Sequence, residues 1–163
     1  LEDIPWAIIG GVATRAYMPE RATYDLDIII RAQDAPQVRQ RLEAAGYTWT
    51  ADLSIPGFTY RAPKGIEVDI ILGDMPWLEQ ALTHPHFDAA GYPVLALPYL
   101  VLLKLAASRM QDIADLARML GQADEATLKQ VRQIVSRYAP QEVEDVESLI
   151  QLGQLETGKN GVK

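Results

Sequence analysis

The sequence predicts an α+β protein in which a mixed sheet flanked by helices is followed by a helical C-terminal bundle. Two observations predict this layout. Short β-branched apolar runs alternate with helical patterns in the N-terminal part, whereas only helical spacing of apolar residues follows Pro98. We therefore expect an α+β core at 1–97 and a helical part packed on it at 98–152. The polar, glycine-containing segment 153–163 is expected to be a flexible tail.

Local patterns predict each element of the α+β part. The buried strand 6–9 ends at the turn-forming pair Gly10-Gly11, and a first helix at 12–17 follows. Asp34 is expected to cap a second helix that has Pro36 in its first turn and ends at Gly46. A short third helix is expected at 77–82. The remaining apolar runs predict strands at 25–30, 47–51, 58–62, 66–72 and 92–96.

The helical part is predicted from apolar residues that recur every three or four positions. This spacing occurs around 100–106 and again around 113–120. Two more helices are expected at 124–138 and 143–152, with Pro140 between them.

Composition excludes several classes of protein. Among the 163 residues, 48% are hydrophobic and 23% are charged, which is typical of a globular protein with a core. The sequence contains no cysteine, which excludes disulfides, thiolate metal sites and cysteine nucleophiles. A formal charge of −7 argues against avid, sequence-independent binding to nucleic acid.

The sequence also predicts no membrane association. The longest apolar run, 94–105, is interrupted by Pro98 and carries Lys104, so it is too short and too polar to span a bilayer. No basic segment followed by an apolar one stands at the start. We therefore expect a cytoplasmic protein.

Three acidic residues lie within apolar strands and are the candidates for chemistry. Asp25 and Asp27 are two apart, so on a strand they share a face, about 7 Å apart along the backbone. Asp69 stands between Val68 and Ile70 on a later strand, and it joins the pair if the two strands are neighbours. Adjacent carboxylates repel each other unless a cation lies between them. Mg²⁺, with Mn²⁺ as a second hard cation, binds such oxygen ligands.

This arrangement suits phosphoryl or nucleotidyl transfer. Two acids can hold Mg²⁺ against a triphosphate, while the third binds a second metal or takes the proton of the attacking hydroxyl. Gly10-Gly11 would allow backbone N–H groups to approach the phosphates. Each feature alone is common, and no dinucleotide or Walker motif is present. Together they favour function, because acids flanked by Leu, Ile and Val cost stability if they are only structural.

Two segments resemble known nucleotidyltransferases. The run Ile-Ile-Gly-Gly-Val-Ala, followed by Arg-Ala-Thr-Tyr-Asp-Leu-Asp-Ile-Ile-Ile, resembles the signature of the nucleotidyltransferase (DNA polymerase β-like) superfamily. The strand around Asp69 is similar to its third-acid motif. Lys104, followed by the Arg-X-X-Asp-X-X-Asp pattern of 109–115, resembles a helical motif of small AbiEii-type nucleotidyltransferases. The resemblance spans about 6–120 and implies a nucleotidyltransferase-like fold.

The resemblance also implies roles for particular residues. Three acids would bind the metal and act in catalysis: Asp25, Asp27 and Asp69. Four residues would contact the nucleotide: Gly10, Gly11, Lys104 and Asp112. The implied reaction is the Mg²⁺-dependent transfer of a nucleoside monophosphate from an NTP such as ATP to an acceptor hydroxyl, with release of pyrophosphate. Similar small proteins modify tRNA ends, proteins or aminoglycosides, and some are toxins with a cognate antitoxin. The acceptor and an antitoxin partner therefore stay open.

Two other interpretations remain. The chain could be a catalytically silent module that kept the fold and binds a nucleotide or a partner. It could also be a plain α+β interaction domain, in which case Asp69 would lie far from the other acids or on the opposite face. Ordinary helical ion pairs explain Arg109, Asp112 and Asp115 as well as a nucleotide site does. Lys104 lies in an apolar helix and must therefore reach solvent or find a partner.

Overall fold

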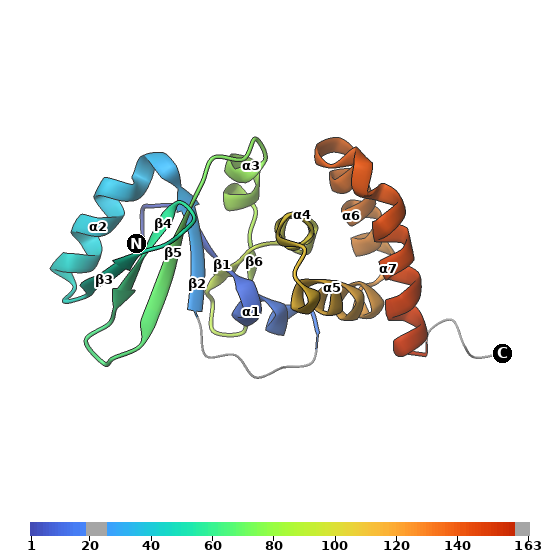
Figure 1. The fold of residues 1–163 in the computed structure, drawn as a ribbon, viewed down its shortest axis with the longest axis horizontal. Coiled ribbons are helices and arrows are strands. Elements are labelled where there is room, and N and C mark those ends of the chain that lie inside the picture. The colour runs from blue at the N-terminus through green and yellow to red at the C-terminus, as the bar shows by residue number, and fades with distance from the viewer. Residues whose placement is uncertain (19–25, 159–163) are drawn as a thin grey trace. The chain divides into compact units, whose positions relative to one another are not determined.

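The computed structural model describes residues 1–18 and 26–158, and the chain divides into two compact units (Figure 1). Unit 1 comprises Leu1–Ala13 and Arg21–Leu95, and unit 2 comprises Thr14–Glu20 and Ala96–Lys163. Unit 1 contains the sheet and unit 2 is helical, so the α+β class with a helical C-terminal part is confirmed. Within the described ranges, no helix combines the length and apolarity that a membrane crossing requires.

Unit 1 is built on a seven-stranded mixed sheet with the order β3-β4-β5-β2-β1-β7-β6. β2 runs parallel to β5 and β1 runs parallel to β7, while the other neighbouring strands are antiparallel. The strands are β1 (Trp6–Ile9), β2 (Leu26–Arg31), β3 (Thr48–Asp52), β4 (Gly57–Arg61), β5 (Glu67–Gly73), β6 (His86–Phe87) and β7 (Pro93–Val94).

One face of this sheet packs against α2 (Ala35–Ala44). Phe58 is in register with Ile70, which is in register with Ile28, so their side chains share this face and form a buried layer. The Arg39 guanidinium lies 3.8 Å from the centre of the Phe58 ring. The Tyr60 hydroxyl donates to a Glu43 carboxylate oxygen at 2.9 Å. Aromatic side chains of β4 therefore attach α2 to the sheet and leave the opposite face for other residues.

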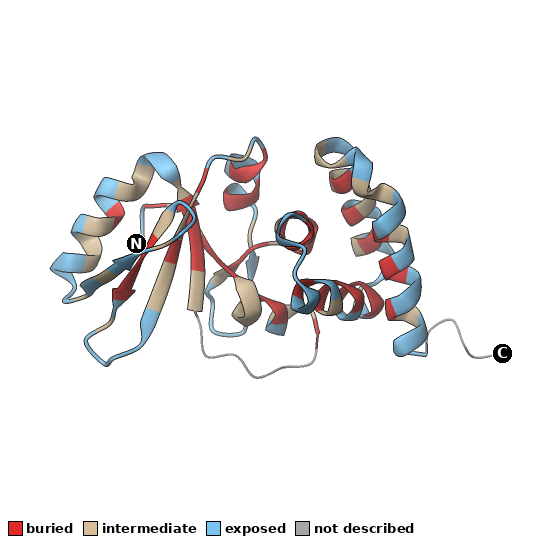
Figure 2. Ribbon diagram, viewed as in Figure 1, coloured by how far each residue is buried: buried red, intermediate tan, exposed pale blue. Residues whose placement is uncertain are grey.

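Short helices complete unit 1, and longer ones form unit 2. Unit 1 also contains α1 (Gly10–Ala13) and α3 (Leu78–Thr83). The helices of unit 2 are α4 (Leu97–Ala107), α5 (Met110–Gln122), α6 (Glu125–Tyr138) and α7 (Val143–Glu156). Figure 2 shows that buried residues concentrate in the central strands of unit 1 and along α4 and α5 of unit 2.

α5 and α7 approach each other so closely that their backbones are in contact. A Cβ atom added at Gly153 of α7 would lie 1.9 Å from the carbonyl oxygen of Ala117 on α5. A Cβ atom at Gly121 would lie 2.3 Å from the carbonyl oxygen of Gly153. Only residues without a side chain fit at these two positions.

Several expected boundaries differ from the structure. α7 continues to Glu156 rather than ending at Leu152, because the contact with α5 holds its last turn. β7 is shorter than the expected strand at 92–96, and α4 begins at Leu97, since a proline is tolerated in the first helical turn. The Asp34 side chain does not cap α2 but accepts a hydrogen bond from Arg31 Nε at 2.7 Å.

Candidate active site

Two of the predicted acids lie side by side on the sheet. Asp27 of β2 is the register partner of Asp69 on the adjacent parallel strand β5. Residues opposite each other on neighbouring strands project from the same face, so both carboxylates belong to the face away from α2. Both residues are half-buried. A plain interaction domain with Asp69 remote from Asp27 or on the other face is therefore excluded, and Asp25 lies outside the described residues.

Gly10 places the end of β1 directly against one of these carboxylates. Ile9, the last residue of β1, pairs with Asp27 on β2. Gly10 follows with φ = +70°, a left-handed conformation that glycine adopts without strain. A Cβ atom added there would lie 2.3 Å from Asp27 Oδ2. Gly10 is thus required by its backbone conformation and by the space that the carboxylate occupies. Gly10 and Gly11 are the first two residues of α1.

Thr59 belongs to the same constellation, although the sequence alone did not single it out. It lies on β4 in register with Asp69, and its side chain is buried. Its hydroxyl donates a hydrogen bond to Asp69 Oδ1 at 2.6 Å. No described residue donates to the other carboxylate oxygen, Oδ2. The local sequence around Thr59 does not identify it as a site residue. It can be recognised only from the register of β4 against β5, which places it opposite Asp69.

The described residues include two of the three predicted metal ligands, Asp27 and Asp69. Nowhere in 1–18 or 26–158 do three or more His, Asp or Glu side chains cluster closely enough to hold a metal ion. Asp27 and Asp69 contribute two neighbouring carboxylates, which are the oxygen donors that a hard divalent cation binds.

Lys104 and Asp112 belong to unit 2, where they form a buried ionic cluster. Lys104 Nζ lies 3.3 Å from Asp112 Oδ1 and 3.1 Å from Asp115 Oδ2. The exposed fractions of these residues are only 4%, 1% and 0%, respectively. The buried charge of Lys104 in the apolar helix α4 is therefore compensated by ion pairs with two carboxylates of α5. A contact from Lys104 or Asp112 to a triphosphate stays a prediction.

Arg109 completes the cluster at the start of α5. Its backbone N–H and its Nε both donate to Asp112 Oδ2, at 3.2 and 2.7 Å. Burial alone would raise the pKa of Asp112, but the Arg109 hydrogen bond and the Lys104 charge outweigh it and hold the pKa below its ordinary value. Asp112 is therefore ionised at neutral pH and links the end of α4 to the first turn of α5.

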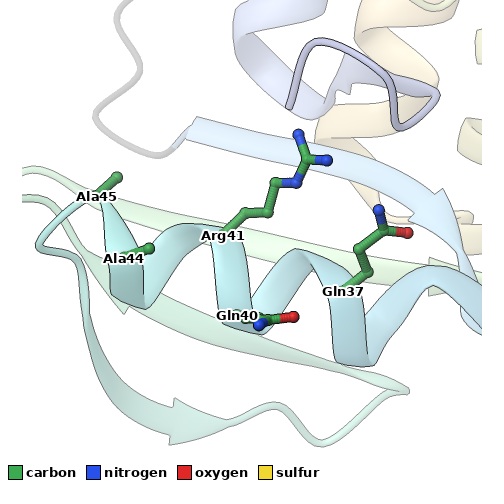
Figure 3. Close-up of a pocket in the computed structure, with 5 residues that line it drawn as sticks. All are labelled: Gln37, Gln40, Arg41, Ala44 and Ala45. Atoms are coloured by element: carbon green, nitrogen blue, oxygen red, sulfur yellow. The ribbon is translucent and has the colours of Figure 1, made fainter.

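Unit 1 also contains a pocket beside α2. Figure 3 shows that its lining comes from one side of α2, with small alanine side chains at one end. The lining residues are Gln37, Gln40, Arg41, Ala44 and Ala45. Arg41 already forms an ion pair with Asp3. Among the described lining residues are neither Asp27 nor Asp69, so the pocket is distinct from the site formed by these two acids.

Comparison with known proteins adds a sequence match for the segment that carries the acids. Residues 2–76 match the profile of the aminoglycoside-2''-adenylyltransferase family. That is a family of nucleotidyltransferases. The matched segment contains Gly10, Gly11, Asp27 and Asp69, in agreement with their resemblance to the nucleotidyltransferase superfamily. The finer resemblance to AbiEii-type proteins stays a prediction.

Solved structures similar to this chain include antibiotic-modifying enzymes. The lincosamide antibiotic adenylyltransferase LnuA, bound to lincomycin, is 13% identical, with 83% of this chain and 88% of that chain covered and a TM-score of 0.45. The solution structure of the antibiotic-resistance factor ANT(2'')-Ia is 14% identical, with coverages of 99% and 90% and a TM-score of 0.48. Its complex with adenylyl-2''-tobramycin is 16% identical, with coverages of 96% and 90% and a TM-score of 0.47. No curated protein sequence matches this chain.

Proposed function

We propose that this protein is an Mg²⁺-dependent nucleotidyltransferase that moves the adenylyl group of ATP to a hydroxyl of a small, cationic acceptor such as an aminoglycoside. The observation that carries the proposal is the pairing of Asp27 with Asp69 on adjacent strands, with Gly10 against the Asp27 carboxylate. The match of residues 2–76 to an adenylyltransferase family supports it, because that segment contains all three residues.

The acids fit a divalent metal. Two half-buried carboxylates in register repel each other unless a cation compensates their charge. Asp27, Asp69 and the sequence neighbour Asp25 would hold Mg²⁺ through oxygen atoms. When bound, the metal would neutralise negative charge that develops on the triphosphate. Gly10 places no side chain against the Asp27 carboxylate, and the backbone at Gly10-Gly11 can approach the phosphates because neither residue carries a side chain.

The chemical step is an in-line displacement at the α-phosphorus of ATP. The acceptor oxygen forms a bond to that phosphorus while the bond to the bridging oxygen breaks, and pyrophosphate leaves with the electron pair. Asp69 would take the proton of the attacking hydroxyl or bind a second metal ion. A proton acceptor of this kind contributes about 10²–10⁴-fold to rate. The described groups therefore supply binding of the triphosphate and removal of one proton.

Charge favours a cationic acceptor. The chain carries a formal charge of −7, which attracts cations and repels polyanions such as RNA. Aminoglycosides carry several ammonium groups at neutral pH, so their attraction to an acidic protein is favourable. A tRNA acceptor, a protein acceptor and a toxin–antitoxin role stay predictions from the sequence.

The test is a transfer assay with a panel of acceptors. The protein is incubated with Mg²⁺, each of the four labelled NTPs and tobramycin, kanamycin, lincomycin or no acceptor. Pyrophosphate release and the mass of the acceptor are then measured. We expect ATP to label an aminoglycoside, and Asp27→Asn and Asp69→Asn to lose about 10²–10⁴-fold in rate. Asp74→Asn is the matched control, because Asp74 is exposed and follows β5 directly.

The outcomes separate the proposal from its rival. Label on an acceptor that depends on Asp27 and Asp69 supports the proposed reaction. Metal-dependent nucleotide binding without any transfer would instead favour a silent nucleotide-binding module. Neither binding nor transfer, with the acid variants behaving like the wild type, would contradict both.

A further inference from the structure

The Thr59 hydroxyl donates a hydrogen bond to Asp69, although this carboxylate is exposed enough to be solvated by water instead. The side chain of Thr59 lies in the middle of β4, is 7% exposed, and donates to Asp69 Oδ1 at 2.6 Å. This distance lies within the 2.5–2.7 Å range of O–H···O⁻ bonds to ionised carboxylates, which are about twice as strong as neutral ones. Asp69 itself is only half-buried, so water could have solvated it. The bond therefore fixes the orientation of the carboxylate more than it satisfies a buried charge.

Thr59 is itself held in place, so it can act as a fixed support. Its branched Cβ restricts rotation about χ1 on a strand. Its carbonyl oxygen accepts a hydrogen bond from the Thr50 hydroxyl of the neighbouring strand β3 at 3.2 Å. Its backbone is paired with Asp69 on β5. The backbone of Thr59 is therefore held by both neighbouring strands, and its restricted χ1 angle can keep the hydroxyl directed at Asp69.

The hydrogen bond from Thr59 makes the two carboxylate oxygens of Asp69 different from each other. Oδ1 accepts from Thr59, while no described residue donates to Oδ2. Holding one oxygen prevents the carboxylate from rotating and keeps the other oxygen directed to one place. Groups that orient a metal-binding carboxylate in this way typically change metal affinity by about 10–100-fold when they are removed.

We propose that Thr59 is a positioning residue that orients Asp69 for binding a divalent metal, an inference that rests on the proposed nucleotidyltransferase function. Its hydroxyl acts through Asp69 and touches neither the nucleotide nor the acceptor. The requirement is for the hydroxyl and not for the shape of the side chain. Serine can therefore replace threonine, and valine cannot.

The experiment measures binding of Mn²⁺ alone, followed by the electron paramagnetic resonance signal of free Mn²⁺. Thr59→Val removes the hydroxyl and keeps the shape, so we expect affinity to fall about tenfold. Thr59→Ser should stay within about twofold of the wild type. Thr48→Val is the matched control, because it makes the same substitution at an exposed position of β3 that is in register with Arg61 and not with an acid. Thermal unfolding of each variant shows that it is folded, and Thr59→Ala replaces the valine variant if that one is not.

Each result bears on one proposal or on both. Equal Mn²⁺ affinity of wild type and Thr59→Val, with binding lost in Asp69→Asn, would refute the positioning role and leave the proposed function intact. Equal losses in Thr59→Ser and Thr59→Val would also refute it, since packing would then matter rather than the hydroxyl. A wild-type protein that binds no Mn²⁺ would contradict the metal-dependent function and the positioning role together.

Discussion

Gly10 offers the sharpest test of the candidate active site, because an alanine there introduces two separate penalties. Gly10 has φ = +70°, where a residue with a Cβ atom costs about 1–2 kcal/mol. The added Cβ would also lie 2.3 Å from Asp27 Oδ2. An ordinary contact begins near 3.4 Å, so the carboxylate oxygen would have to move by about 1 Å. Misplacement of a catalytic group by about 1 Å can cost about 100-fold in rate.

Gly65 provides a control that separates the two penalties. It has φ = +92°, but a Cβ atom added there meets nothing within 4 Å. Both Gly10→Ala and Gly65→Ala should therefore lower the free energy of unfolding, measured by urea denaturation, and Gly10→Ala should lower it more because it adds the contact with Asp27. Only Gly10→Ala should weaken Mn²⁺ binding and reduce the rate of adenylyl transfer about 100-fold. If both variants bind Mn²⁺ and react like the wild type, the close approach of Gly10 to Asp27 has no functional meaning and the reasoning is wrong.

Three further predictions concern unit 2. Gly153→Ala should be destabilising, because overpacking against the α5 backbone costs about 1–3 kcal/mol or more and the gain in helix propensity is only about 1 kcal/mol. The urea midpoint of Gly153→Ala should fall, whereas that of the control Gln151→Ala, an exposed position of the same helix, should stay unchanged. A higher midpoint for Gly153→Ala would contradict the close contact between α5 and α7. Lys104→Met should destabilise by about 3–5 kcal/mol in the same assay, because it removes the ammonium group that pairs with two buried carboxylates. Wild-type stability would argue against the buried cluster. The lowered pKa of Asp112 implies that its contribution to stability is present above about pH 4 and is lost as pH falls through the folded-state value. The stability difference between wild type and Asp112→Asn should shrink in acid, and a constant difference would contradict the shift.

Strands and helix caps that depend on a local sequence pattern could be predicted from the sequence. The apolar alternation around Asp69 and the β-branched run after Asp27 predicted two strands, and the structure contains both as β5 and β2. The acidic N-cap of α6 was equally local: Asp124 accepts a hydrogen bond from the Thr127 N–H at 2.7 Å. These features depend on neighbours a few residues away, which the sequence displays directly.

Features that depend on pairing between distant segments were not predictable. The Thr59–Asp69 bond requires the register of β4 against β5, which no single strand specifies. Trp49 is 48% exposed because β3 is an edge strand, a position that the local sequence does not reveal. The helical spacing of Arg109, Asp112 and Asp115 could be read from the sequence. Only the packing of α4 on α5 shows that Lys104 and the two acids form a buried cluster.

The backbone contact between α5 and α7 also determines where this chain can be shortened. Its sequence invites removal of everything after Leu152, since the remainder is polar and rich in glycine. That cut would delete Gly153 and the last turn of α7, which ends at Glu156. The backbone of α5 would then lose the surface that covers it at Ala117 and Gly121. The Thr157 hydroxyl also donates to the Gly121 carbonyl oxygen at 3.4 Å. A boundary after Gly158 preserves both contacts, so a tag or a fused protein is better attached there than directly after Leu152.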